Sequence, residues 1–200
     1  MKKIKKNKIG ILGGTFDPAH IGHIKISKEA KKKFKLNKIF WIITKKNPFK
    51  KKSFFSLKKR INYAKKININ NKFIKIYFFE DKIKSNKTID LMKFLKNRYK
   101  KTEFFFIMGA DNLINFHKWK KWNQIKSLVN IVCVSRPGYT NSFNGEIENI
   151  SFIDKLDLDI SSSMIRDKIL SDNPKDFLDT EHFLDKNVFK YILDSKVCQH

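Results

Sequence analysis

The chain has 200 residues, 41% of them hydrophobic, and a formal net charge of +25. This length favours a single domain with a sizeable buried core, and the hydrophobic fraction excludes a wholly disordered chain. No apolar run approaches the ~20 residues that span a membrane, and the apolar stretch after the basic N-terminus is too short for a signal peptide, so a cytoplasmic protein is expected.

Strands and helices alternate along the chain. The near-continuous apolar run 38–44 is typical of a strand buried on both faces, whereas the apolar spacing over 55–67 is that of a helix. The predicted strands cover residues 8–12, 38–44, 73–79, 103–108, 130–135 and, as a short sixth one, 150–154. The predicted helices cover residues 20–34, 55–67, 86–99, segments ending near 128, and 161–171. This order predicts an α/β fold with a Rossmann-like, doubly wound, mostly parallel sheet of five to six strands and helices on both faces.

Nothing in the sequence divides the chain by a linker or a repeat. Residues 1–200 are therefore expected to form one domain, with a C-terminal helical segment at about 174–196. Cys133 lies inside an apolar run and is expected to be buried, and two cysteines without metal-site spacing fit a reducing compartment. The scattered lysines indicate solvated faces and loops, although a basic protein that binds nucleic acid is kept as an alternative.

Glycine, histidine and charged residues gather directly after the predicted strands. They lie at 13–23 after the first strand, at 44–50 after the second, at 109–112 after the fourth and at Arg136 after the fifth. Ligands of such sheets bind at the carboxyl ends of the strands. These segments are therefore expected to form one site.

Residues 11–25 read ILGGTFDPAHIGHIK. Gly13 and Gly14 are expected to form a tight turn that a phosphate can approach, although the G-x-G-x-x-G and Walker A patterns are absent. His20 and His23 are expected in a first helical turn, with Gly22 between them leaving room for a ligand. Both imidazoles then face an anion at the helix N-terminus. A zinc site is less well supported, because no cysteine or carboxylate cluster accompanies them.

The motif GGTFDPAHIGH resembles the signature of the nucleotidylyltransferase superfamily, whose H-x-G-H binds the ATP phosphates. The stretch ISSSMIR at 160–166 is similar to that family's ISSTxIR, although alone it also fits a plain helix N-cap. The resemblance implies that Ser161, Ser162 and Arg166 hold the β- and γ-phosphates, since an arginine fork donates in parallel to phosphate oxygens. The ATP site that it implies consists of Gly13, Gly14, Thr15, Phe16, His20, His23, Gly109, Asp111, Ser161, Ser162 and Arg166.

Three further segments resemble the bacterial nicotinate-nucleotide adenylyltransferases: MGADNLINFHKWKKW at 108–122, NPFK at 47–50 and SRPG at 135–138. The resemblance implies that Trp119 stacks on a pyridine ring whose carboxylate is held by backbone N–H groups. Asp111 is implied to accept hydrogen bonds from ribose hydroxyls, with a helix N-cap as its other reading, and Trp122 is interpreted as a core residue. The implied substrate-binding residues are Thr88, Trp119, Arg136 and Lys50, and Lys87 stands where the family usually has tyrosine.

The implied reaction transfers the adenylyl group of ATP to nicotinate mononucleotide, with His20, His23 and Arg166 as catalytic residues. Its products are deamido-NAD and pyrophosphate. Mg²⁺ is expected to be held mainly through the ATP phosphates, without metal ligands from the protein. The same chemistry on nicotinamide mononucleotide or phosphopantetheine stays open as an alternative. The expected partners are ATP and nicotinate mononucleotide, without a membrane or nucleic acid, and the oligomeric state stays open.

Overall fold

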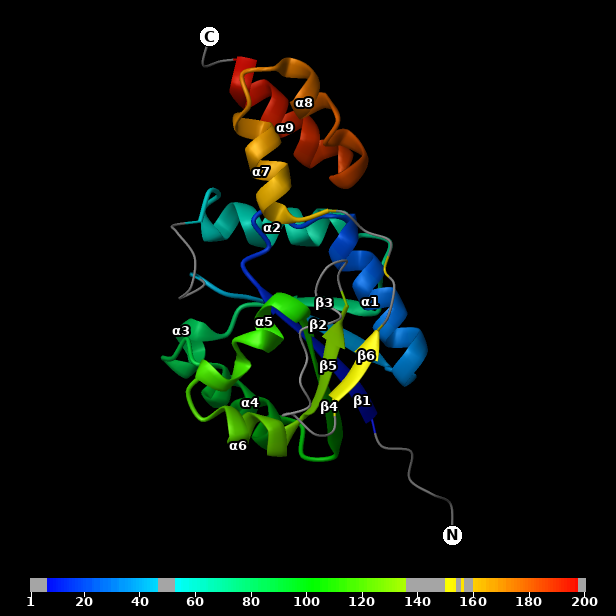
Figure 1. Ribbon diagram of the computed structural model, residues 1–200, viewed down its shortest axis with the longest axis vertical. Coiled ribbons are helices and arrows are strands. Elements are labelled where there is room, and N and C mark those ends of the chain that lie inside the picture. The colour runs from blue at the N-terminus through cyan, green and yellow to red at the C-terminus, as the bar shows by residue number, and fades with distance from the viewer. Residues whose placement is uncertain (1–6, 47–52, 136–149, 154–155, 157–159, 198–200) are drawn as a thin grey trace.

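Six parallel strands form one sheet in the order β3-β2-β1-β4-β5-β6 (Figure 1). The computed structural model describes residues 7–46, 53–135, 150–153, 156 and 160–197. The strands are β1 (Asn7–Gly14), β2 (Lys38–Ile43), β3 (Ile74–Tyr77), β4 (Thr102–Gly109), β5 (Asn130–Val134) and β6 (Ile150–Ile153). The chain runs from β1 outward to β3 and then from β4 outward to β6, so the strand order reverses between β1 and β4. The predicted doubly wound fold is confirmed.

Helices cover both faces of the sheet because successive strand residues point to opposite faces. One core contains Ile11 and Phe106 and is covered by α4 (Thr88–Arg98), α5 (Ala110–Ile114) and α6 (Trp122–Leu128). The other contains Leu12 and Ile107 and is covered by α1 (Ile21–Phe34) and α2 (Leu57–Ile67). The remaining described helical segments are α3 (Glu80–Ile83), η1 (Phe116–Lys118), α7 (Ser162–Leu170), α8 (Pro174–Leu178), η2 (Glu181–Phe183) and α9 (Lys186–Val197).

The C-terminal helices gather at one end of the molecule, beyond α2 (Figure 1). A third apolar cluster joins them to the rest of the fold, because it contains Phe55 and Tyr63 from the α2 region together with Ile165 of α7 and Ile192 of α9. Phe177 of α8 stacks on Phe189 of α9, with ring centroids 4.7 Å apart. Helices α8 and α9 lie in this C-terminal part of the chain, and α9 packs against α2.

The tight turn predicted at Gly13 and Gly14 is wrong. Both glycines continue β1, where they lie opposite Ile42 and Ile43 of β2, and the Thr44 N–H still donates to the Gly14 carbonyl at 3.0 Å. The turn comes four residues later, at Asp17 and Pro18. Pairing on β2 outweighs the conformational freedom of glycine here, so the two glycines provide a side-chain-free strand end beside the site.

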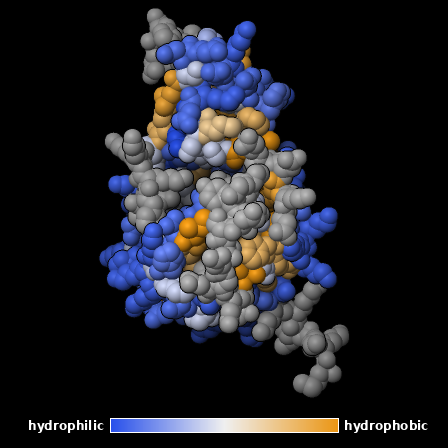
Figure 2. Space-filling model, in the orientation of Figure 1, coloured by the Kyte–Doolittle hydropathy of each residue, from blue (hydrophilic) through white to orange (hydrophobic). Residues whose placement is uncertain are grey.

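The structure adds one element and confirms two residue interpretations. The short helix α3 lies between β3 and α4, where the sequence pattern predicted no helix. Cys133 is 1% exposed in the β4–β5 region of the core, and Trp122 packs against the same core. In the part of the chain that the structure describes, none of the helices combines the length and apolar character needed to cross a membrane. Hydrophilic residues cover most of the described surface in the view of Figure 2.

Candidate active site

A cavity of about 530 Å³ opens where the strand order reverses, at the carboxyl ends of β1 and β4. Every predicted site residue that the structure describes lines it, which brings together segments more than a hundred residues apart in the sequence. These residues are Gly13, Gly14, Thr15, Phe16, His20, His23, Thr88, Gly109, Asp111, Trp119, Ser161, Ser162 and Arg166. Lys50 and Arg136 lie outside the described residues.

The cavity is rich in cationic side chains. Lys46, Lys87, Lys118 and Lys120 line it together with Arg166, whereas Asp111 is the one carboxylate among the lining residues that the structure describes. Such a balance of charge favours an anionic ligand.

His20 and His23 form a reciprocal cap on the first turn of α1. The Nδ1 atom of His20, the N-cap residue, accepts a hydrogen bond from the Gly22 N–H at 3.2 Å, and Nδ1 of His23 accepts one from the His20 N–H at 3.3 Å. A neutral imidazole that accepts at Nδ1 carries its proton at Nε2. The cap therefore assigns both rings, whose centroids are 3.9 Å apart, as Nε2–H donors.

Gly22 serves this cap more than it serves a ligand. A Cβ atom at this position would lie 2.8 Å from Nδ1 of His20 and 3.0 Å from Cγ2 of Ile160. The His20 ring folded over the helix thus takes part of the room beside Gly22, and Gly22 still lines the cavity. Glycine is required here because any side chain would displace that ring.

A layer of buried aromatic side chains packs against the His23 ring. Phe16, which adopts a φ of 49°, stacks on Trp41 with ring centroids 4.9 Å apart and lies 4.7 Å from the His23 ring. The Trp41 indole N–H donates to the Ser27 hydroxyl at 2.8 Å, and that hydroxyl donates to the His23 carbonyl at 2.8 Å. Sequence reasoning missed Trp41 and Ser27; the only signal was a tryptophan in a buried strand, which needs a hydrogen-bond partner.

The N-terminus of α7 is tied to the loop that follows β1. The Ser161 hydroxyl accepts from the Met164 N–H at 3.1 Å, so this serine is the N-cap of α7. A helix N-cap was one of the two roles predicted for this stretch. Ser162 donates to the Pro18 carbonyl at 3.0 Å, and Arg166 donates to the Asp17 carbonyl at 2.7 Å. Ser162 and Arg166 thereby join the last helix of the site to the loop that carries the histidines.

Two polar atoms on the opposite wall are buried without a hydrogen-bond partner among the described residues: Oδ1 of Asp111 and Nε1 of Trp119. The helix N-cap reading of Asp111 is wrong, since Gly109 holds that position in α5. Trp119 is held edge-on by Phe106 and Phe116, at centroid distances of 6.1 and 5.5 Å. Buried polar atoms normally find partners, so an acceptor and a donor that lack them indicate a place for a ligand.

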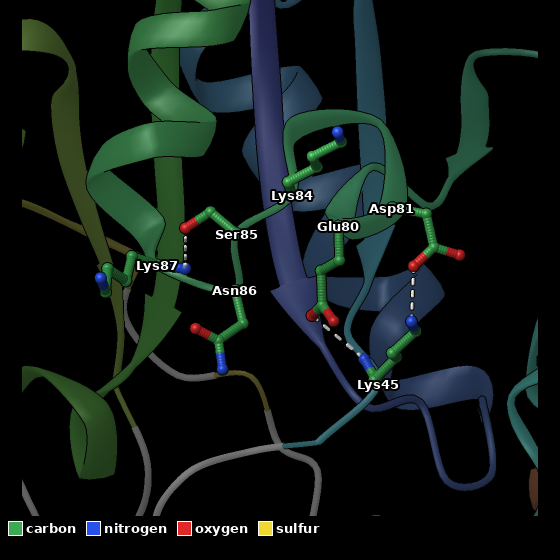
Figure 3. Close-up of a pocket in the computed structure, with 7 residues that line it drawn as sticks. All are labelled: Lys45, Glu80, Asp81, Lys84, Ser85, Asn86 and Lys87. Atoms are coloured by element: carbon green, nitrogen blue, oxygen red, sulfur yellow. Dashed lines mark hydrogen bonds and ion pairs between the residues drawn. The ribbon is translucent and has the colours of Figure 1, made fainter.

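A second, open hollow adjoins the cavity through Asn86 and Lys87 (Figure 3). Its carboxylates are engaged by one residue: the Lys45 N–H donates to Glu80 at 3.1 Å, and the Lys45 ammonium pairs with Asp81. Burial raises the pKa of Glu80, while the hydrogen bond and charge of Lys45 oppose that shift. Both carboxylates of this hollow are already engaged by Lys45, so the deeper cavity is the candidate site.

Comparison with known proteins gives a consistent picture. The family model described as cytidylyltransferase-like matches residues 11–168. A protein of Pelagibacter ubique named probable nicotinate-nucleotide adenylyltransferase is 55% identical over 169 residues, which cover 81% of this chain and 93% of that protein. A protein of the same name from Ruegeria sp. is 37% identical over 65% of this chain and 68% of its own length.

Among solved structures, the Plasmodium falciparum nicotinic acid mononucleotide adenylyltransferase complexed with NaAD superposes with a TM-score of 0.77 at 20% identity. The match covers 94% of this chain and 96% of that one. At this level of identity, the likeness establishes the Rossmann-like fold.

Proposed function

The chain belongs to the cytidylyltransferase-like family and, within that family, to the nicotinate-nucleotide adenylyltransferases. We propose that it transfers the adenylyl group of ATP to nicotinate mononucleotide. The products are deamido-NAD and pyrophosphate, a step of NAD biosynthesis. The observation that carries the proposal is the cavity itself. One wall holds two Nε2–H imidazoles and an arginine, and the other holds two polar atoms that have no hydrogen-bond partner among the described residues.

The phosphate end of the proposed site is the wall formed by His20, His23, Ser162 and Arg166. A 5′-phosphate oxygen of the mononucleotide forms a bond to the α-phosphorus of ATP, and the bond from that phosphorus to the leaving oxygen breaks, so pyrophosphate departs with the electron pair. The attacking phosphate is already anionic and needs no general base. The imidazole N–H groups and the guanidinium donate to oxygens on which negative charge grows.

The acceptor end of the proposed site is the wall formed by Thr88 and Trp119, and Asp111 of the proposed ATP site lines the same cavity. Asp111 Oδ1 is suited to accept from ribose hydroxyls, and the Trp119 indole offers an aromatic face to a pyridine ring. Lys50 and Arg136 are proposed as further contacts to the mononucleotide on the strength of the sequence motifs.

Mg²⁺ is proposed to enter with ATP. Among the residues that the structure describes, no group of three or more His, Cys, Asp or Glu side chains is placed to hold a metal ion. A hard cation that keeps most of its waters and is held through substrate phosphates needs few ligands from the protein. When bound, Mg²⁺ neutralises phosphate charge; the alignment comes from the protein groups named above.

The proposal is tested by pyrophosphate release from purified protein with Mg-ATP and one of three acceptors: nicotinate mononucleotide, nicotinamide mononucleotide or phosphopantetheine. A strong preference for nicotinate mononucleotide is expected. Preference for another acceptor would retain the phosphate-end chemistry and contradict the assignment of the acceptor wall. Release with none of the three, together with salt-dependent binding to DNA or RNA, would instead favour a basic nucleic-acid-binding protein.

A further inference from the structure

Arg60 is a buried cation that lies near the cavity without lining it. It lies in α2, is 2% exposed, and does not line the cavity. Its guanidinium donates to four carbonyl oxygens: those of Thr44 at 2.8 Å, Lys45 at 2.9 Å, Phe55 at 3.0 Å and Thr15 at 2.7 Å. Burial lowers the pKa of Arg60, and the nearby charges of Asp17 and Glu80 oppose that shift. Burying a charge is costly, so this arrangement requires a function that a smaller apolar residue cannot supply.

The four carbonyls belong to three separate segments. Thr15 lies in the loop between β1 and the histidines, Thr44 and Lys45 follow β2, and Phe55 precedes α2. Thr15 and Thr44 themselves line the cavity. A single planar group therefore fixes the distance between two cavity walls, and its rigid fork suits this task better than a flexible ammonium.

Asp17 makes the reciprocal connection from the loop back to α2. Its carboxylate, which is 3% exposed, accepts from the Phe54 N–H at 2.6 Å and from the Phe55 N–H at 2.8 Å. With Ser162 and Arg166 bound to the carbonyls of Pro18 and Asp17, the loop is held by α2 on one side and α7 on the other. Three of its carbonyl oxygens are thus engaged by donors rather than left to repel a phosphate.

We propose that Arg60 is a positioning residue for adenylyl transfer: it holds the Thr15 loop against the end of β2 so that His20 and His23 are aligned before ATP binds. This inference rests on the proposed function. Because misplacement of a catalytic group by about 1 Å can cost about a hundredfold in rate, losing this clamp should act on kcat. The acceptor wall of Thr88 and Trp119 receives no bond from Arg60, so the KM for nicotinate mononucleotide should change little.

The test compares Arg60→Lys and Arg60→Met with Lys58→Met, which removes an equal charge from an exposed position of the same helix. We expect kcat to fall about tenfold in Arg60→Lys and about a hundredfold in Arg60→Met, with the KM for nicotinate mononucleotide within about threefold of wild type. Lys58→Met should behave as wild type. If Arg60→Met does not fold, Arg60→Lys decides, because it keeps the charge and most of the aliphatic stem.

A spectroscopic measurement separates positioning from a general loss of stability. The ¹⁵N shifts of the imidazoles report whether Nδ1 or Nε2 is protonated, and we expect the fixed tautomers of His20 and His23 to become averaged in folded Arg60→Lys. A kcat within about threefold of wild type, or unchanged imidazole shifts, would overturn the proposal. An inactive wild type would instead overturn the proposed function, so the two failures are distinguishable.

Discussion

At the scale of single residues, the histidine cap separates two roles that an alanine substitution removes together. His20 caps α1 through Nδ1 and also lines the cavity, where its Nε2–H is the proposed donor to ATP. His20→Asn keeps an acceptor at the position of Nδ1, since asparagine is a favoured N-cap residue, but it has no group that reaches as far as Nε2. We expect the melting temperature to stay near that of wild type while kcat falls about 10²–10³-fold, the usual loss for one donor to a developing charge.

His20→Ala and His23→Ala provide the comparison for this prediction. Both should show the same loss of kcat, and both should in addition lower the melting temperature because each ring accepts one hydrogen bond of the reciprocal cap. A fall of less than about tenfold in all three folded variants would contradict the catalytic roles assigned to these histidines.

Tyr63 gives a pH-dependent prediction at the same scale. Its hydroxyl is buried without a hydrogen-bond partner among the described residues, and burial raises its pKa to about 12. Between the ordinary tyrosine pKa of about 10 and that value, the folded state retains a proton that the unfolded state loses, so stability falls as the pH rises. Tyr63→Phe should therefore be at least as stable as wild type at pH 7, and its advantage should grow between about pH 9 and pH 11.

Urea unfolding of wild type and of Tyr63→Phe at about pH 9 and at about pH 11 checks this prediction. The comparison cancels the titration of lysines, which both chains share. An advantage that shrinks as the pH rises would show that the Tyr63 hydroxyl is stabilised in the folded state rather than stranded there.

At the scale of secondary-structure elements, the bond between α7 and the loop after β1 sets the phosphate end of the site. Ser162→Ala removes the hydrogen bond to the Pro18 carbonyl and leaves the N-cap at Ser161 intact. A net hydrogen bond of about 0.5–1.5 kcal/mol corresponds to a two- to tenfold rise in the KM for ATP. Lys168→Ala is the matched control in the same helix, because the ion pair of Lys168 with Asp179, the C-cap residue of α8, is partly exposed and neither residue lines the cavity. Steady-state kinetics with ATP as the varied substrate measures both.

The elements also show what sequence patterns can and cannot predict. Alternating apolar runs predicted five to six strands, a mostly parallel sheet and the edge at which the site lies, because burial on both faces leaves a clear signal. Gly13 and Gly14 were assigned to a turn because glycine permits one, whereas pairing with β2 decides that they extend the strand. Arg60 could not be singled out from the sequence, because it is the one buried cation in a lysine-rich helix. Contacts between distant segments are what the sequence leaves undetermined.

At the scale of the whole molecule, the third apolar cluster argues for one cooperative domain. Phe55 and Tyr63 at α2 pack in the same cluster as Ile165 and Ile192 of the C-terminal helices. We propose that the chain unfolds in a single thermal transition. Ile192→Ala in α9 should shift that whole transition, at a cost of about 2–5 kcal/mol, and Lys190→Ala, on the exposed face of α9, should not. Two separate calorimetric transitions, with only one of them moved by Ile192→Ala, would mean that the C-terminal helices form an independent unit.

The net charge of +25 has a direct consequence for substrate capture. The cavity gathers four lysines and Arg166 around a single described carboxylate, and both proposed substrates are anions. Attraction of this kind acts over about 10 Å at 0.1 M salt and is screened beyond that. We expect kcat/KM for nicotinate mononucleotide to fall about tenfold between about 20 mM and 500 mM KCl, while kcat changes little.

The same titration discriminates between a field that serves the active site and one that serves a polyanion. If the charge acts on small substrates, duplex DNA should inhibit only weakly at low salt, and its effect should disappear before substrate capture does, because a polyanion loses many counterion contacts at once. Strong inhibition by DNA that persists at physiological salt would show a dedicated nucleic-acid surface. A kcat/KM that does not depend on salt would instead show that the lysines of the cavity lie too far from the path of the substrate to attract it.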